Sequence, residues 1–574
     1  MPAPREGPHV NVSRSLALLA ALASVAYTGV AASAAPFARE RAMPAIRELS
    51  FASLRGNYLG PIAPGTPISI YVHVQGRHEE QLAAFVAAID TPGSPDFGHY
   101  LTPQQFGAYF GAAPGEYAQA LATLRAAGFT IDKLVANRTD IVAHAPAAVV
   151  ERFFGSPIDQ RSERGRSFFT MRYTPVYPAG LHAEEVSGLE TYVRFHSHAR
   201  RTAHTIESWT PQDLAAGYDL NPLYASGLDG KGVTIANATS GAAEPGDLAL
   251  FQKHFGLPSA QLISVPIGGP LTKAGNSESS LDVDSALSVA REATFEQVVA
   301  YNAYNNDFDR MYSYIVNDLG SSVHVVTTSW GVCEREMEAT PAALKLQEGL
   351  FAQAAAEGQW WFSASGDNGT DDCDDGGTAL SVDFPGSSPY VMSVGGTDVR
   401  PTLSGGAVTG WAAETTWQYS NSDGASGGGK SILYKKPAYQ NKLTPADGVR
   451  DVPDVAALAD PDNDGLYVAD DGALQSGWGG TSDAAPQWAA VLAIVEQRYG
   501  GKIVTDPHVR LYALAATSRY HSLFHDILHG NNGVPLGDDM YYPNLSFPGY
   551  SAGPGFDRTT GLGSYIGAAL VESY

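Results

Sequence analysis

Residues 479–493 read Gly-Gly-Thr-Ser-Asp-Ala-Ala-Pro-Gln-Trp-Ala-Ala-Val-Leu-Ala, in which a glycine turn precedes an apolar run. The glycines predict a tight turn and the apolar spacing predicts a buried helix, so Ser482 is expected where a loop enters that helix. Backbone N–H groups at a helix start stabilise developing negative charge, which suits a nucleophile. Serine also caps helices at such positions, so this stretch alone indicates a hydrolase only weakly.

Two acids offer a partner for this serine. Residues 278–282 read Glu-Ser-Ser-Leu-Asp, and in a helix a spacing of four puts Glu278 and Asp282 on one face. Coupled carboxylates share protons, which pushes their titrations apart and lets one of them accept a proton from Ser482. Two solvated acids on a helix surface are the simpler interpretation of the same pattern.

A third candidate ends another apolar run. Residues 360–369 read Trp-Trp-Phe-Ser-Ala-Ser-Gly-Asp-Asn-Gly, which predicts a buried strand with Asp367 at its carboxyl end. A protonated carboxyl there could donate a hydrogen bond to an oxyanion. Ordinary turn chemistry also explains an aspartate between glycines.

Together these segments resemble the sedolisin, or serine-carboxyl peptidase, family, whose members are subtilisin-like enzymes with a Ser-Glu-Asp set in place of Ser-His-Asp. No histidine of residues 205–574 lies in the His-Gly-Thr context of a subtilisin. The resemblance spans almost the whole chain. It implies Ser482 as nucleophile, Glu278 as general base, Asp282 as the acid that orients the base, and Asp367 as the oxyanion-side aspartate.

The resemblance also implies an α/β fold: a subtilisin-like parallel sheet flanked by helices, preceded by an α+β ferredoxin-like prodomain that blocks the cleft. We expect a secreted, acid-acting serine-type endopeptidase made as a self-processing proenzyme. Glutamate titrates near pH ~4.3 and histidine near ~6.5, so only the former remains a base in acid. A tripeptidyl-peptidase of the same family, a neutral subtilisin-type protease and a catalytically silent binding protein on this scaffold are the alternatives.

Processing signals divide the chain into three expected parts. Residues 1–34 resemble a secretory signal peptide, with basic residues before an apolar run and a small-residue cleavage pattern, although an uncleaved anchor is an alternative. Residues 35–200 are expected to form an inhibitory prosegment domain, and residues 201–574 the catalytic domain. The boundary and a processing site are expected in an exposed linker at 196–207.

Charge is divided unevenly between these parts. Residues 35–204 carry a net charge of +1 and residues 205–574 a net charge of −26. The acidic balance disfavours nucleic-acid binding. Arginine–carboxylate pairs are expected to hold the prosegment, and acidification should weaken them by protonating the carboxylates. Eight of the chain's 15 histidines lie in the prosegment and would gain charge in the same fall of pH.

Local patterns predict elements in both parts. In the prosegment, residues 68–74 alternate as a strand, residues 79–89 have helical spacing, and Thr102 with Pro103 predicts a helix start. The sequence around Thr102 also resembles the family's prosegment signature. In the catalytic part, strands are expected at 232–237, 323–329, 360–365 and 390–394, with helices at 295–316 and 342–357.

The two cysteines, Cys333 and Cys373, argue for one disulfide in a secreted chain, with a Cys/Cys/His metal site as competitor. Four aspartates surround Cys373. A solvated acidic loop is expected there, and part of a substrate pocket is the alternative. They are Asp371, Asp372, Asp374 and Asp375.

Two stretches are candidates for calcium. Residues 460–471 mimic an EF-hand loop, but no amphipathic helices flank them and a hairpin is expected. Residues 524–527 and 553–563 resemble the family's calcium motifs. The resemblance implies one structural Ca²⁺ on the carboxylates of Asp526 and Asp557 and the main-chain oxygens of Ile527, Gly553 and Gly555.

The expected partners are protein or peptide substrates and the chain's own prosegment as an intramolecular inhibitor. No nucleic acid, and no membrane after processing, is expected to bind. We expect a monomer in the extracellular space.

Overall fold

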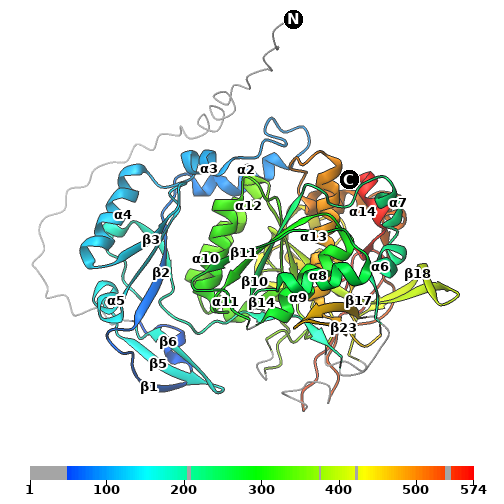
Figure 1. Ribbon diagram of the computed structural model, residues 1–574. Coiled ribbons are helices and arrows are strands. Elements are labelled where there is room, and N and C mark those ends of the chain that lie inside the picture. Colours follow the sequence, from blue (N-terminus) through cyan, green and yellow to red (C-terminus); the bar gives the residue numbers. More distant parts are fainter. Residues whose placement is uncertain are drawn as a thin grey trace, which may run out of the picture.

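The computed structural model describes residues 48–202, 208–273, 275–373, 377–419, 424–463, 465–536 and 544–574. The expected signal peptide lies outside these residues. Two units pack side by side, the amino-terminal one coloured blue to cyan and the larger one green to red (Figure 1).

The amino-terminal unit is built on a four-stranded antiparallel sheet in the order β3-β4-β2-β7. Helix α4 lies between β2 and β3 in the chain, and α5 between β4 and β7, which gives the ferredoxin-like β-α-β-β-α-β order. The bounds are β2 (Pro67–Val74), α4 (Pro114–Ala127), β3 (Thr130–Leu134), β4 (Asp140–Pro146), α5 (Ala147–Phe154) and β7 (Ala183–Ser187).

The local predictions for this unit are confirmed. Besides β2, helix α2 (Glu79–Ile89) and helix α3 (Pro103–Tyr109) form where they were expected. Thr102 begins α3 with a capping box, in which its hydroxyl accepts from the N–H of Gln105 while the Gln105 side chain accepts from the N–H of Thr102. A second, three-stranded sheet consists of β1 (Asn57–Pro61), β5 (Ile158–Glu163) and β6 (Arg166–Met171).

A mainly parallel sheet forms the larger unit, in the order β11-β12-β10-β13-β15-β17-β18, with β21 also paired to β17. Only the β17–β18 pair is antiparallel among the described strands of this sheet. The bounds are β10 (Thr234–Ser240), β11 (Leu262–Ile267), β12 (Thr294–Ala300), β13 (Val325–Thr328), β15 (Trp360–Ala364), β17 (Val391–Ser404), β18 (Ala407–Thr416) and β21 (Val455–Leu458).

One expected element is wrong in part. The helix predicted over 295–316 begins only at Asn305, because residues 294–300 form β12 and pair with both β10 and β11. The residues Thr-Phe-Glu-Gln-Val-Val-Ala favour a strand once two neighbours are available, which periodicity within the segment does not reveal. Helix α10 (Asn305–Tyr314) and helix α12 (Pro341–Glu357) then cover the face of the sheet toward the amino-terminal unit (Figure 1).

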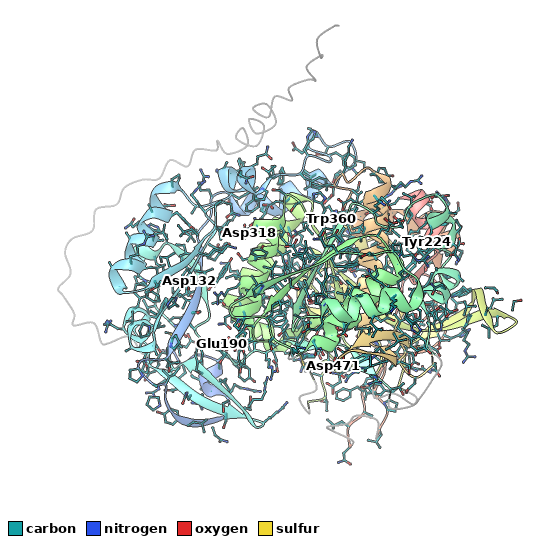
Figure 2. All side chains as sticks on the ribbon, viewed as in Figure 1. Asp132, Glu190, Tyr224, Asp318, Trp360 and Asp471 are labelled. Atoms are coloured by element: carbon teal, nitrogen blue, oxygen red, sulfur yellow. A yellow bond between two sulfur atoms is a disulfide. The ribbon has the colours of Figure 1, made fainter. Side chains whose placement is uncertain are left out.

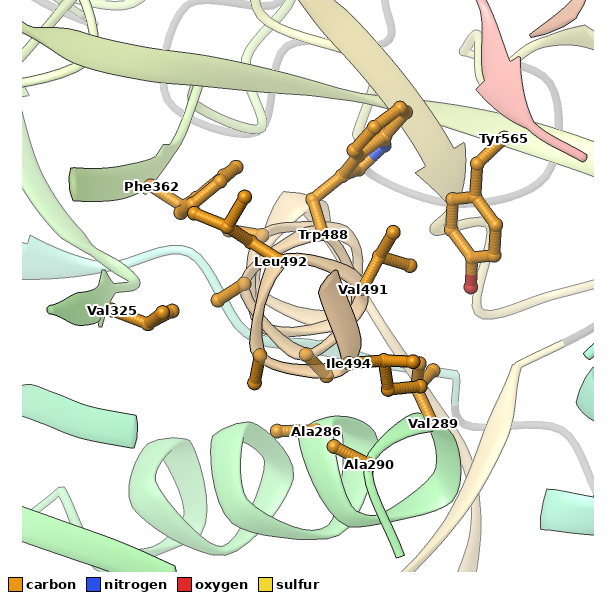
Figure 3. Packing of buried hydrophobic residues seen from close by; sticks show 14 of the residues in the cluster. Ala286, Val289, Ala290, Val325, Phe362, Trp488, Val491, Leu492, Ile494 and Tyr565 are labelled. Atoms are coloured by element: carbon orange, nitrogen blue, oxygen red, sulfur yellow. The ribbon is translucent and has the colours of Figure 1, made fainter. Parts of the chain in front are cut away.

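Helix α13 (Thr481–Arg498) is the centre of the larger core. Every residue from Thr481 to Glu496 is buried, and the helix packs against the sheet and against helix α9 (Asn276–Val289). Figure 3 shows Trp488, Val491, Leu492 and Ile494 pointing outward from α13 in different directions, with Ala286 and Ala290 of α9 beneath it. A helix enclosed on all sides has to be apolar all round, which its sequence is after the first turn.

Contacts between the two units are apolar, neutral polar and ionic. Tyr71 of β2 is buried in the larger unit's core cluster, and Ser187 donates to the buried Asp309 of α10. Lys133 pairs with Asp318, which Figure 2 labels at this boundary, and Lys345 of α12 pairs with Glu184. The expectation that arginine–carboxylate pairs hold the prosegment is met in part: Arg200 pairs with Asp367 in the cleft, and the charges of prosegment arginines oppose the burial that raises the pKa of Glu336 in the larger unit.

Within the described residues, no helix combines the length and apolar character needed to cross a membrane.

The α9–α13 contact generates a stability prediction. Ala286 is 1% exposed beneath α13, so Ala286→Leu should force the helices apart and lower the free energy of unfolding by about 1–3 kcal/mol. Thermal unfolding of the parent chain and the variant measures this. Ala249→Leu on the exposed face of helix α8 (Pro245–Phe255) is the control and should change little. Equal melting temperatures for both variants would contradict the packing argument.

Candidate active site

The expected pair of acids lies on one face of α9 at the foot of α13. Glu278 and Asp282 are 2% and 1% exposed, and Ser482 in the first turn of α13 is fully buried. The Ser482 hydroxyl faces Glu278, although neither Ser482 Oγ nor Glu278 Oε1 makes a well-aligned hydrogen bond in this resting state. The solvated-surface interpretation of this pair is therefore wrong.

Asp282 is fixed by two neighbours from parallel strands. Ser329, which follows β13, donates to Asp282 Oδ1 at 2.6 Å, and Asn237 of β10 donates to Oδ2 at 3.0 Å. Pro486 has no N–H to bond the carbonyl of Ser482, and the Ser329 hydroxyl lies 3.4 Å from that oxygen instead. One serine thus contacts both the acid and the backbone of the expected nucleophile.

Asp367 follows β15 and reaches the same place from the sheet. Its Oδ1 accepts from the N–H and the hydroxyl of Thr481, each at 2.8 Å, which leaves Oδ2 directed into the cleft. Gly480, with φ of +94°, lines this corner: a Cβ there would stand 2.6 Å from Asp367 Oδ2 and 2.1 Å from the carbonyl oxygen of His198. Only glycine fits between these two oxygens.

The segment between the two units runs through this cleft as an extended chain. Strand β8 (His196–Ser197) pairs antiparallel with β14 (Trp330–Cys333), and the N–H of His198 donates to the carbonyl of Ser329 at 3.1 Å. Strand β9 (Arg200–Arg201) pairs antiparallel with β23 (Ala473–Gly479). The expectation of an exposed linker holds only in part for residues 196–202, since Ser197 and Arg201 are exposed, His198 is buried and the others are half-buried. Residues 203–207 lie outside the described part.

The linker pairs with β14 before the His198–Ala199 peptide bond and with β23 after it. On one side of the bond, the carbonyl oxygen of His198 lies at the corner of Gly480 and Asp367. On the other side, the N–H of Ala199 donates to Glu278 Oε2 at 2.9 Å. Glu278 thus contacts the N–H of this peptide unit, and Asp367 Oδ2 lies at the corner of Gly480 where its carbonyl oxygen lies.

Burial sets the protonation of these acids. Burial, and the neighbouring charge of Asp282, raise the pKa of Glu278 well above its usual range, and burial raises the pKa of Asp282 to about 7. Burial also raises the pKa of Asp367, while the Arg200 guanidinium, 3.3 Å from Oδ2, opposes that rise. Burial thus favours the neutral form of Asp367, which can donate a hydrogen bond, and Arg200 of the linker disfavours that form.

An acidic pocket receives the side chain of His198. Asp372 and Asp383 are 3% and 2% exposed, so the expectation of a solvated loop is wrong for Asp372, and likewise for Asp371. Asp374 and Asp375 lie outside the described residues. His198 Nε2 lies 3.3 Å from Asp383 Oδ2.

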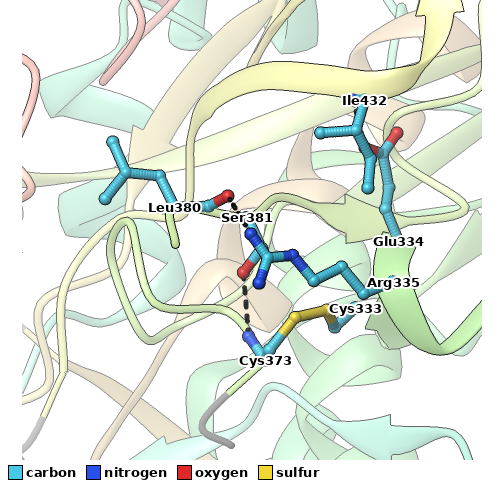
Figure 4. The surroundings of a disulfide bond; sticks show 7 residues. All are labelled: Cys333, Glu334, Arg335, Cys373, Leu380, Ser381 and Ile432. Carbon is cyan, nitrogen blue, oxygen red and sulfur yellow. Dashed lines mark hydrogen bonds between the residues drawn. A yellow bond between two sulfur atoms is a disulfide. The ribbon is translucent and has the colours of Figure 1, made fainter. Parts of the chain in front are cut away.

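The predicted disulfide is present and borders this pocket. It joins Cys333, at the end of β14, to Cys373, whose N–H donates to Ser381 Oγ at 3.0 Å (Figure 4). The bridge therefore ties the strand that pairs with the linker to the loop that carries Asp372.

The segments expected to bind calcium come together behind the cleft. Asp526 accepts from the N–H of Gly555 at 3.0 Å, and Asp557 from the N–H of Gly553 at 3.2 Å. No described lysine or arginine pairs with either carboxylate; His521 stands 3.9 Å from Asp526. Two adjacent acids without a countercharge fit a hard divalent cation. The EF-hand-like stretch instead leads into a hairpin of β22 (Leu466–Asp470) and β23, as predicted.

Sequence reasoning missed Asn237, Ser329, Thr481 and Asp383. Ser329 could have been found from its place just after the carboxyl end of a buried strand, where parallel sheets keep their sites, whereas Asn237 lies in the middle of β10. Thr481 was readable as the neighbour of Ser482. No local signal marks Asp383, since β16 (Asp383–Phe384) has only two residues.

Comparisons with known proteins agree with this geometry. Residues 55–188 match the pro-kumamolisin activation domain and residues 274–522 match the subtilase family. Kumamolisin of Bacillus sp. strain MN-32 is 31% identical over 90% of this chain and 93% of its own length. The mouse tripeptidyl-peptidase 1 is 25% identical over 90% and 93%. The structure of Pseudomonas sedolisin, a serine-carboxyl proteinase complexed with pseudo-iodotyrostatin, covers 64% of this chain and 98% of that chain at 28% identity and a TM-score of 0.55.

Proposed function

The chain belongs to the sedolisin family of serine-carboxyl peptidases, and on that basis we propose that it is a secreted, acid-acting endopeptidase that matures by cutting its own linker at His198–Ala199. The observation that carries the proposal is the position of that bond, whose N–H contacts Glu278 and whose carbonyl oxygen lies at the corner of Gly480 and Asp367. Peptide-bond hydrolysis itself follows from the family.

In this mechanism Ser482 attacks the substrate carbonyl while Glu278 accepts its proton. Glu278 then returns the proton to the leaving amine, the group whose N–H it already contacts in Ala199. Asp282, held by Ser329 and Asn237, shares a proton with Glu278, so the pair never has to carry two buried charges. Neutral Asp367 donates to the oxyanion that forms beside Gly480.

Acid conditions suit each of these roles. Asp367 has to keep its proton, and burial favours the neutral form. Glu278 has to be ionised while the linker is in place; burial raises its pKa, and its interactions with the Ser482 hydroxyl and the N–H of Ala199 oppose that rise. Lower pH therefore favours the donor, while these two interactions favour the ionised base.

The path of the linker supports endopeptidase action. His196 is the third residue before the proposed bond, and the chain continues past it, where Phe195 donates its N–H to the carbonyl of Ala303 at 2.8 Å. A cleft that admits chain beyond the third residue does not require a free amino terminus. Similarity to tripeptidyl-peptidase 1 keeps the three-residue mode as the second candidate. A silent binding protein is disfavoured because all four reactive residues converge.

Two further parts of the proposal concern location and stability. The signal-like residues 1–34 and the disulfide support secretion. The proposed calcium ion would bind Asp526 and Asp557, with main-chain oxygens of Ile527, Gly553 and Gly555, and would fix the carboxyl-terminal loops.

Self-processing tests the proposal directly. At pH about 4 the purified full chain should convert to a species that begins at Ala199, identified by amino-terminal sequencing and intact mass. Ser482→Ala and Glu278→Gln should lower the rate at least about 1,000-fold, since each removes a reacting group. Glu292→Gln, a surface change of the same chemistry, is the control. Maturation of both site variants without added protease would sink the mechanism.

The pH profile of that reaction should respond to Arg200. Arg200→Gln removes a cation that lowers the pKa of Asp367, so Asp367 keeps its proton to higher pH and the alkaline limit of self-processing should move up by roughly 1 pH unit. Arg201→Gln is matched in charge, but Arg201 lies over the Trp478 ring instead. Initial rates between pH 3 and 7 measure both variants. A shift common to both, or absent from both, would contradict the role given to Asp367.

Removal of calcium should destabilise the chain, and this effect should depend on Asp526 and Asp557. Chelation of Ser482→Ala protein should lower its melting temperature, by the equivalent of about 3 kcal/mol if calcium had been present at 100 times its dissociation constant. Asp526→Asn with Asp557→Asn should abolish the difference between calcium and chelator. Asp460→Asn with Asp462→Asn, in the EF-hand-like stretch, should preserve it. If the Asp460/Asp462 variant lost the calcium effect and the Asp526/Asp557 variant kept it, the ion would bind at the EF-hand-like stretch and the proposed site would be wrong.

A further inference from the structure

Two histidines of the linker lie on the same side of an extended chain. His196 and His198 are separated by one residue, and alternate side chains of a strand point to the same face. Their rings stand edge to face with centroids 4.8 Å apart. The linker therefore presents two imidazoles together to the floor of the cleft.

That floor contains carboxylates that nothing in the described protein satisfies. Both oxygens of Asp383 and both of Asp372 lack a well-formed hydrogen bond, and so does His198 Nε2. The 3.3 Å contact between His198 Nε2 and Asp383 Oδ2 meets the distance of an ion pair without the geometry of a hydrogen bond. Buried polar atoms are rarely left without partners, so this group calls for a ligand.

The spacing of these groups suits a metal ion. The ligand atoms of His196, His198 and Asp383 all lie within 4.8 Å of one another. Three atoms at the corners of a triangle of that side lie about 2.8 Å from its centre, so side-chain shifts of less than about 1 Å bring them to the ~2.0–2.2 Å bonds of zinc. Asp372, which interacts with Asp383, is the candidate for a fourth ligand. Two imidazoles and two carboxylates suit Zn²⁺ better than Ca²⁺, which prefers oxygen alone.

We propose that His196 and His198 of the linker, with Asp383 and Asp372 of the catalytic unit, form a zinc site that clasps the prosegment to the cleft.

The zinc ligands come from two parts of the chain that the proposed cleavage would separate. Cleavage at His198–Ala199, which rests on the proposed function, leaves both histidines on the prosegment and both aspartates on the enzyme. A bound zinc ion would then join the two products across the cut, with His198 still in the pocket. Zinc should therefore slow release of the cleaved prosegment and delay the appearance of activity on an added peptide.

Direct metal binding is the test, with Ser482→Ala protein at neutral pH and calcium in excess. Competition against a chromophoric zinc indicator should show one site per chain, and Co²⁺ in its place should give the visible bands of four-coordinate cobalt. His196→Asn with His198→Asn should weaken zinc binding about 100-fold or more and remove those bands. His254→Asn, a surface histidine of α8, is the control and should change neither.

The zinc site would be ruled out if no stoichiometric binding were found, or if the double variant bound zinc as tightly as the parent. Asp372 and Asp383 would then be interpreted as a pocket for a cationic side chain. This result is separable from the proposed function. Wild-type protein that matures in zinc-free buffer supports the peptidase whether or not zinc binds. Zinc binding by a chain that never matures would support the site and contradict the peptidase.

Discussion

The close contact of α9 with α13 is the constraint on which the site depends. Small side chains at Ala286 and Ala290 let the helices approach, and the same face of α9 one to two turns earlier carries Glu278 and Asp282. The acids therefore meet Ser482 because the helices pack, without any loop having to hold them. The sheet adds Asn237 from the middle of β10, and Ser329 and Asp367 from beyond the carboxyl ends of β13 and β15. A buried dyad on such a scaffold has few ways to move, which is the preorganisation that acid–base chemistry needs.

The prosegment uses two different kinds of contact. Its sheet packs on α10 and α12 through the buried Tyr71, the Ser187–Asp309 hydrogen bond and a few ion pairs of both polarities. Its last residues enter the cleft by strand pairing, a form of recognition that depends on the main chain and accepts varied side chains. Although the two units differ greatly in net charge, the described interface between them contains few ion pairs. Buried carboxyl groups, Asp309 among them, are the more important pH-sensitive features there.

Sequence reasoning was most successful where chemistry and periodicity coincide. The helix at Glu278 and Asp282, the turn before Ser482, the strand before Asp367 and the Cys333–Cys373 bridge were all readable. β12 was mistaken for helix because its partners lie far away in the chain and decide its state. The linker was expected to be exposed, and its polar residues give no sign that its main chain pairs with β14 and β23 or that His198 is buried. The burial of Asp372 and Asp383 also depends on tertiary structure alone, so the pocket around His198 could not be foreseen.

The linker is held by two separate two-residue ladders, one on each side of His198–Ala199. While the bond is intact, each ladder keeps the other at a high effective concentration, so weak pairings together occupy the cleft. In the proposed self-cleavage, each half of the linker would have to bind on its own, and the new amino terminus could diffuse from β23 independently of the prosegment. The loss of bivalency would make cleavage effectively irreversible, because the cut chain could not readily reoccupy the cleft in the same way.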